Sequence, residues 1–163
     1  MPNSRLTRGQ WGIVIFNALY LIAFTAYYLS IKNFEFIWYV VVIAFFFALI
    51  VWTLPRTHFD GVVLGGLSLW GLLHMAGGGV PVHGAVLYKL PIIHLFGEGD
   101  SLVFKFDQLV HFIGFGVATI LFYHLLRYYL KPDANWKVVY PLIVLGGMGI
   151  GALNEIVEFI AVV

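Results

Sequence analysis

The sequence predicts an all-α fold, a polytopic transmembrane helical bundle of five spans that forms a single transmembrane domain over residues 1–163. Hydrophobic residues make up 61% of the chain and charged residues only 10%, whereas soluble domains carry roughly 25% charged residues. The mean hydropathy is +0.94. Five apolar stretches approach the length of about 20 residues that a helix needs to cross the hydrocarbon core. We therefore expect an integral membrane protein whose first partner is the lipid bilayer.

The composition also excludes several classes of function. A net charge of +1 argues against nucleic acid as a partner. Several spans within 163 residues leave no room for a soluble catalytic domain. Because the chain has no cysteine, disulfides and thiolate metal sites are excluded, and any metal would have to be held by imidazole and carboxylate groups.

The first two predicted spans are expected to be aromatic scaffold helices. They cover residues 11 to about 31 and residues 36–54, and Pro55 is expected to end the second. A removable signal peptide is not expected, because the first apolar stretch is too long and lacks a small-residue cleavage site. Neither span has an ionisable residue in its interior, and both are rich in aromatic residues, which is typical of lipid-facing helices.

The third predicted span, residues 60–78, is rich in glycine and is expected in the interior of the bundle. Gly61 and Gly65 have the small-xxx-small spacing that allows helices to approach closely. A connection of about 27 residues follows, which is longer than an ordinary link between helices. Its apolar core, LYKLPIIHLF, indicates a functional or re-entrant loop that folds back over the bundle at the membrane surface.

The fourth predicted span covers residues 106–130, and the fifth runs from about residue 138 to the end of the sequence. In the fifth span, Gly147 and Gly151 repeat the small-xxx-small spacing. The sequence ends in the apolar run FIAVV, so a sixth helix after the fifth is also compatible with the pattern.

Basic residues predict the orientation of the bundle. With five spans, one side carries six of them and the other side only three. The first set is Arg5, Arg8, Arg56, Arg127, Lys131 and Lys137, and the second is Lys32, Lys89 and Lys105. Because positively charged loops stay in the cytoplasm, the N-terminus is expected to be cytoplasmic and the long loop external.

Ionisable residues concentrate in the outer half of three predicted spans. His74 lies near the end of the third span, Asp107 and His111 near the start of the fourth, and Glu155 and Glu158 late in the fifth. Such residues are costly in a membrane and usually serve a function. Asp107 and His111 are four residues apart, so they share one face of a helix and can share a hydrogen bond or a ligand.

The composition of this cluster points to a metal. Three carboxylates and two imidazoles exceed what fixing the helix register would require, and buried carboxylates are costly unless they are paired or bound to metal. We therefore predict one site for a divalent cation such as Zn, Fe or Mn, in which carboxylates orient imidazoles. The predicted ligands are His74, Asp107, His111, Glu155 and Glu158. The predicted catalytic groups are Asp107, His111 and Glu155.

Two other interpretations of the cluster stay open, namely a purely structural set of hydrogen bonds and a proton relay. His83 and His94, on the long loop, are candidates for further ligands or substrate contacts. His58 and His124 fall near the opposite side and are left out of the site. His124 lies close in sequence to Arg127 and is interpreted as an interfacial residue.

Three motifs carry a resemblance to a known family. LHMAGG at 73–78, FDQLVHFIGFG at 106–116 and NEIVEF at 154–159 resemble the pattern of the YjdF-like bacterial inner-membrane proteins. This resemblance implies a fold, a site and an inner (cell) membrane location rather than a reaction. Asp107, His111 and Glu155 are its most specific positions. The spacing of these residues is also similar to that of VanZ-like proteins, although this sequence has Glu158 where those tend to have glutamine.

Three classes of function remain open at this point. The protein is either a small membrane enzyme or metal-binding protein that acts on a lipid or other apolar substrate, or a non-catalytic accessory subunit that binds other membrane subunits. The third class, a component of a proton or ion pathway, has less support because the sequence shows no internal repeat.

Overall fold

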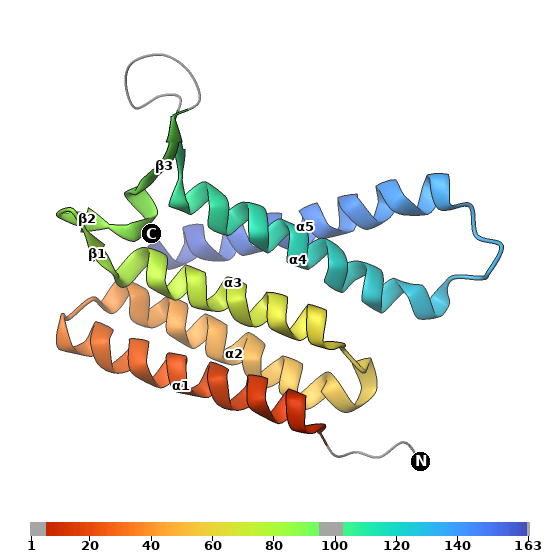
Figure 1. Cartoon of the computed structure of the whole chain (residues 1–163), viewed down its shortest axis with the longest axis horizontal. Helices are drawn as coiled ribbons and strands as arrows, with labels where there is room; N and C mark the ends of the chain where they lie inside the picture. The colour runs from red at the N-terminus through yellow and green to blue at the C-terminus, as the bar shows by residue number, and fades with distance from the viewer. Residues whose placement is uncertain (1–5, 95–102, 163) are drawn as a thin grey trace.

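The structure is a computed structural model that describes residues 6–94 and 103–162, except for the side chains of residues 158, 161 and 162. Five helices in this part of the chain are long and apolar enough to cross a membrane, which confirms the predicted five-span all-α bundle. Figure 1 shows these helices, which are α1 (Arg8–Ser30), α2 (Phe34–Thr57), α3 (Gly61–Gly79), α4 (Phe106–Leu126) and α5 (Trp136–Val162).

The connection between α3 and α4 contains two short antiparallel strand pairs. Their members are β1 (Pro81–Val82) with β2 (Ala85–Val86), and β3 (Pro91–His94) with β4 (Val103–Lys105). The first pair turns through His83 and Gly84, whose φ angles of 48° and 81° are both positive, as a two-residue type I′ hairpin requires. Between the pairs, the short 3₁₀ helix η1 (Leu87–Lys89) packs on α3 and α4. The part of the connection around η1 therefore folds back over the bundle, as predicted, whereas the β3–β4 hairpin projects away from the helices and β3 is exposed along its length (Figure 1).

Polar side chains fix the starts of the first three helices. Thr7 and Gln10 form a capping box, in which each side chain accepts a hydrogen bond from the backbone amide of the other, at 3.2 and 2.9 Å. Asn33 caps α2 and Asp60 caps α3, each with a side-chain oxygen that accepts hydrogen bonds from backbone amides of the first turn. The backbone amide of Val63 donates to Asp60 at 3.0 Å and contributes most to holding the pKa of that carboxyl below its usual range.

The second helix does not end at Pro55. It continues to Thr57, and His58 then adopts a left-handed conformation with a φ of 49° while its amide donates to the carbonyl of Leu54 at 3.0 Å. A proline in the last turn removes one amide donor, and the preceding turn remains intact. The predicted end of the second span was therefore wrong by a few residues.

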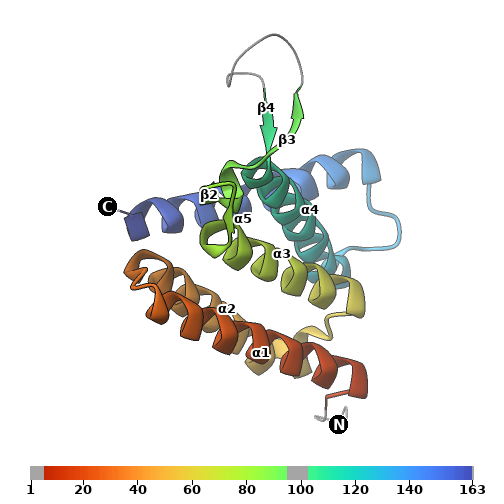
Figure 2. The same ribbon diagram turned by 60° about the vertical axis from the view of Figure 1, so that its left-hand side comes forward.

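Helix α3 occupies the middle of the bundle, between the α1–α2 pair and α4, as Figure 2 shows. A Cβ on Gly66 would lie 2.9 Å from Val117 of α4, and one on Gly71 would lie 2.6 Å from the Tyr20 hydroxyl of α1. The predicted central position is confirmed, but the predicted glycines are wrong. A Cβ on Gly61 or Gly65 would meet nothing within 4 Å.

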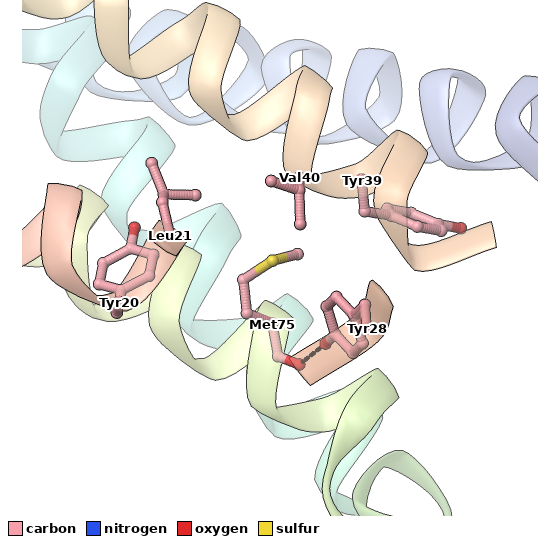
Figure 3. Close-up of a cluster of buried hydrophobic side chains, with 6 residues drawn as sticks. All are labelled: Tyr20, Leu21, Tyr28, Tyr39, Val40 and Met75. Atoms are coloured by element: carbon pink, nitrogen blue, oxygen red, sulfur yellow. Dashed lines mark hydrogen bonds between the residues drawn. The ribbon is translucent and has the colours of Figure 1, made fainter. Parts of the chain in front are cut away.

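Buried side chains join α1, α2 and α3 at two levels. Near the connection between α1 and α2, the phenol of Tyr28 donates to the carbonyl of Met75 within an apolar cluster that Figure 3 shows. Deeper in α1, Asn17 donates to the hydroxyl of Ser68 at 2.8 Å and accepts from the Tyr20 hydroxyl at 2.8 Å. Asn17 is a buried polar link that the interpretation of the first span as plain scaffold missed.

Helices α4 and α5 approach each other through glycines of α5. A Cβ on Gly147 would lie 2.2 Å from Thr119 Oγ1 and 2.7 Å from Thr119 Cα, and one on Gly151 would lie 2.0 Å from the Phe115 ring. The predicted small-xxx-small contact of Gly147 and Gly151 is therefore confirmed. These contacts place the last turns of α5 beside the first turns of α4 (Figure 1).

The two ends of the bundle differ in charge. We call the end that carries β1–β4 the hairpin end and the opposite end the basic end (Figure 1). Among the described residues, the basic end carries Arg8, Arg56, Arg127, Lys131 and Lys137, and the hairpin end carries Lys32, Lys89 and Lys105. The fold thus reproduces the partition of basic residues that the sequence predicts.

The glycine seam between α4 and α5 generates a first prediction. Gly147→Ala should lower the free energy of unfolding by about 1–3 kcal/mol, because the added methyl group overlaps the backbone of Thr119. Denaturant titration in micelles, followed by circular dichroism, measures this change. Gly149→Ala is the matched control, since a Cβ there meets nothing within 4 Å, and alanine should be neutral or stabilising by up to about 1 kcal/mol. Equal losses at both positions would contradict the packing of this seam.

Candidate functional site

The site is built at the start of α4. Strand β4 runs directly into this helix, so Asp107 and His111 lie in its first two turns. The side chain of Gln108 accepts a hydrogen bond from the backbone amide of Lys105 at 2.7 Å and secures the helix start. A carboxylate in the first turn is also favourable, because the helix dipole is positive there.

His111 contacts Asp107 with one ring nitrogen. Its Nδ1 lies 2.9 Å from the backbone carbonyl oxygen of Asp107 and 3.3 Å from the Asp107 carboxylate oxygen Oδ1. Since a carbonyl oxygen only accepts hydrogen bonds, Nδ1 carries a proton and donates it. The predicted contact between these two residues is therefore present, and it fixes the orientation of the ring.

The other ring nitrogen of His111 contacts α5. Its Nε2 lies 2.9 Å from the Glu155 carboxylate oxygen Oε1, so the two groups form an ion pair when the ring is protonated. A lone pair on Nε2 would repel an ionised carboxylate at this distance, so the contact is favourable only when the ring or the carboxylate carries a proton. We call Asp107, His111 and Glu155 the His111 triad.

Exposure differs among the three members of the triad. The side chain of His111 is 20% exposed, whereas those of Asp107 and Glu155 are 46% and 51% exposed. The imidazole is thus held inside the α4–α5 seam while the two carboxylates border the outside of the bundle. A small ligand that approached from outside the bundle would meet the two carboxylates before it met the imidazole.

A buried donor lies one turn deeper than His111. A Cβ on Gly114 of α4 would lie 2.5 Å from Nε1 of Trp70 in α3, and this indole nitrogen is buried without a hydrogen-bond partner within the described residues. Gly114 follows His111 by three residues, so it lies on the same face of α4. Sequence reasoning missed Trp70, because nothing in a tryptophan within an apolar span marks its N–H as unpaired.

His74 is buried on α3 and packs between two tyrosines. Its ring centroid lies 5.4 Å from that of Tyr39 in α2 and 5.8 Å from that of Tyr88 in η1. The Tyr88 hydroxyl also donates to the carbonyl of His74 at 3.0 Å. The connection between α3 and α4 is thereby attached to α3 beside His74. The apolar core of the loop was the signal in the sequence that predicted this attachment. Nothing in the sequence indicated that Tyr88 would make it.

The donor set of the predicted metal site is only partly assembled. Within the described residues, no three His, Asp or Glu side chains form a group that could hold a metal ion. Asp107 and Glu155 approach opposite nitrogens of His111, so the two carboxylates cannot join the ring on one ion. The side chain of Glu158 lies outside the described part of the chain. The metal-binding role of the five predicted ligands stays a prediction.

The remaining histidines lie elsewhere. His83 is in the β1–β2 turn and His94 in β3, and both are exposed. His124 lies in the last turn of α4 next to Arg127, and its side chain is only 2% exposed. Phe59 and Asp60, from the turn between α2 and α3, pack against it. The burial of His124 was not predicted, because sequence reasoning considered its neighbours in sequence and not this turn.

The contact between His111 and Glu155 generates a second prediction. In a double-mutant cycle of His111→Ala and Glu155→Gln, the free energies of unfolding in micelles should be non-additive by about 0.5–3 kcal/mol, because each residue loses its partner in either single variant. Phe112→Leu, at an exposed neighbour on α4, serves as the control and should be additive with Glu155→Gln. Additivity in both cycles would show that the contact carries no energy.

Comparison with known proteins identifies the family. The family model described as "Predicted membrane protein (DUF2238)" matches residues 12–163. The YjdF-like proteins fall within this family, so the resemblance drawn from the motifs is confirmed. No curated protein and no solved structure matches the chain. Because the family model spans all five helices and the complete His111 triad, the chain belongs to the DUF2238 family of predicted membrane proteins.

Proposed function

We propose that the protein is a small membrane enzyme in which the His111 triad transfers protons to and from a lipid or other apolar substrate. The observation that carries this proposal is the imidazole held between two carboxylates, with Nδ1 at 3.3 Å from Asp107 and Nε2 at 2.9 Å from Glu155. General acid–base groups need to be oriented and within reach of a partner that accepts the proton. A ring that served only to fix the helix register would need one such contact.

The roles of the three residues follow from the geometry. Asp107 and its backbone carbonyl keep a proton on Nδ1 of His111, so this nitrogen orients the ring. A proton carried at the contact of Nε2 with Glu155 is the mobile one, and the half-exposed carboxylate can pass it to a bound molecule. Groups of this kind typically contribute about 10²–10⁴-fold to a rate.

The same proposal includes an orientation. The N-terminus and the basic end face the cytoplasm of a bacterial cell, and the hairpin end lies at the outer leaflet of the inner membrane. Support comes from the basic residues, because five described ones lie at the basic end and three at the hairpin end. The His111 triad is then reached from the outer leaflet or its surface.

A divalent metal at the triad is the second candidate. The 2.9 Å between Nε2 of His111 and Oε1 of Glu155 fits the distance of about 3 Å between two ligands of one Zn or Fe ion. Asp107 would then orient the ring from behind, as carboxylates do at other histidine ligands. Two described ligands are fewer than the three or four usual for zinc, so Glu158 or another group would have to complete the set. When bound, such an ion supplies an activated water at neutral pH.

Turnover of membrane lipids tests the enzyme proposal. Purified protein in proteoliposomes made from a bacterial lipid extract should change the amount of at least one lipid species, as measured by mass spectrometry. His111→Ala and Glu155→Gln should each reduce this turnover by about 10²-fold or more, since the mobile proton is lost. Phe112→Leu is the control, because this side chain is exposed and the substitution changes no ionisable group.

Three outcomes separate the alternatives. Turnover that depends on His111 together with stoichiometric Zn, Fe or Mn by elemental analysis would favour the metal-dependent enzyme. The same turnover without metal would favour acid–base chemistry alone. No turnover by the wild-type protein, or equal turnover by His111→Ala, would overturn the proposal and favour an accessory subunit whose polar cluster is structural.

Thiol labelling tests the orientation. The chain has no cysteine, so single cysteines at His83 and Arg56, which are both exposed, give unambiguous signals. A membrane-impermeant maleimide added to intact cells should label position 83 and not position 56, and both should react after permeabilisation. Labelling of position 56 alone would reverse the orientation and place the triad at the cytoplasmic leaflet.

A further inference from the structure

The β3–β4 hairpin exposes apolar side chains outside the helical bundle. All four residues of β3 are exposed, and two of them are the neighbouring isoleucines Ile92 and Ile93, at 41% and 52% exposure. Within the described part of the chain, no helix covers these two side chains. Neighbouring apolar side chains that stay uncovered typically mark a surface that contacts a membrane or another molecule.

The direction of the hairpin places these side chains beside lipid. Strand β4 runs directly into α4, so the base of the hairpin lies at the end of a helix that can span the membrane. Figures 1 and 2 both show the hairpin extending to the side of the helices, across their direction. Because spanning helices run through the bilayer, a hairpin directed sideways from their ends lies along the membrane surface. Its exposed side chains therefore continue the lipid-facing surface of the bundle.

The backbone edge of β3 is poorly suited to pairing with a strand of another protein. Pro91 has no amide hydrogen to donate. The register also shifts within the strand, because Pro91 lies opposite Lys105 and Ile93 lies opposite Phe104. Prolines and breaks of this kind keep an exposed edge from adding a further strand. The isoleucine side chains, rather than the backbone edge, are thus the contact surface.

The charges beside the hairpin fit a lipid headgroup layer. Lys105 ends β4 and Lys89 ends η1, just before β3 begins, and both side chains are at least partly exposed. Such lysines can bind the anionic phosphates of lipids while apolar neighbours reach the acyl chains. The outer edges of a two-stranded hairpin still need water or headgroups as hydrogen-bond partners, which the hydrocarbon core does not supply. The boundary between headgroups and acyl chains meets both requirements.

We propose that the β3–β4 hairpin is an interfacial anchor that rests on the lipids at the hairpin end of the bundle. Ile92 and Ile93 insert at the boundary between headgroups and acyl chains, and the lysines bind the phosphates. This contact fixes the depth of α4 in the membrane, because β4 continues into α4 without a linker. His111 lies about 9 Å along the helix from Lys105, so the anchor also fixes the depth of the His111 triad.

Depth measurement by spin labelling tests the anchor. The chain has no cysteine, so Ile93→Cys carries a single nitroxide label. In nanodiscs of phosphatidylethanolamine and phosphatidylglycerol that hold one copy of the protein, this label should be more accessible to oxygen, which concentrates in lipid, than to a water-soluble nickel chelate. It should report a depth within about 10 Å of the headgroups.

Two further positions give the reference values. His83→Cys, in the exposed β1–β2 turn, should report water. Phe112→Cys, at a 74% exposed position within α4, should report hydrocarbon. The label at position 93 should lie between these two values.

Removal of the isoleucines tests their part in the anchor. With the label at His94→Cys, the last residue of β3, replacing Ile92 and Ile93 together by serine should shift the label's accessibility several-fold towards the nickel chelate. Val86→Ser is the matched control, because it removes a 37% exposed apolar side chain from β2, outside the β3–β4 hairpin. It should leave the accessibility of position 94 unchanged.

Three results would overturn the proposal. The first is a label at position 93 that the nickel chelate reaches as readily as the label at position 83. The second is protection that appears only in nanodiscs with two copies, because the hairpin would then contact a second copy of the chain. The third is an equal shift in Val86→Ser and in the double isoleucine variant. These readings use no turnover, so the anchor can fail while the proposed enzyme function stands.

Discussion

Close approach of helix backbones is the constraint on which the rest of this bundle depends. Inside a bilayer, helices gain little by hiding apolar side chains from one another, so packing and polar contacts must hold them together. The α4–α5 seam shows the consequence for the site. Gly151 accommodates the Phe115 ring, and these two residues lie one turn inside Glu155 and His111, respectively. The glycine sets the spacing of the helices at which the imidazole and the carboxylate meet.

Polar pairs between helices recur at three levels of the bundle. Asn17 bonds Ser68 between α1 and α3, His111 contacts Glu155 between α4 and α5, and His124 faces Asp60 between α4 and α3. The Asn17–Ser68 pair is uncharged and lies towards the middle of its helices. The two titratable pairs, at His111 and His124, lie nearer the helix ends. This arrangement follows the cost of charge in hydrocarbon, which falls towards the interface. The polar pair near the middle of the bundle is therefore uncharged, and the pairs that contain ionisable side chains lie nearer the helix ends.

The sequence predicted correctly those features that depend only on the geometry of one helix or on the thickness of the bilayer. The five spans follow from hydrocarbon thickness, and the Asp107–His111 contact follows from a spacing of four residues on one helix. Contacts between elements were predicted less well, because spacing does not say which helix, if any, lies opposite. Gly147 and Gly151 face α4, but Gly61 and Gly65 have the same spacing and face nothing within 4 Å. The burial of His124 depends on a turn 64 residues earlier, around Asp60.

Tyr88 makes His74 less accessible than His111, although both lie towards the hairpin end. Its ring occupies the space beside Gly77, its edge meets the His74 ring, and its hydroxyl is bonded to the His74 carbonyl. A ligand that approached His74 from this side would first have to displace the Tyr88 side chain and break its hydrogen bond to the His74 carbonyl. His111, by contrast, is 20% exposed and contacts two carboxylates that are about half exposed. The same bundle end thus holds one imidazole that is partly open beside two carboxylates and another that a ligand could reach from the Tyr88 side only by displacing this tyrosine.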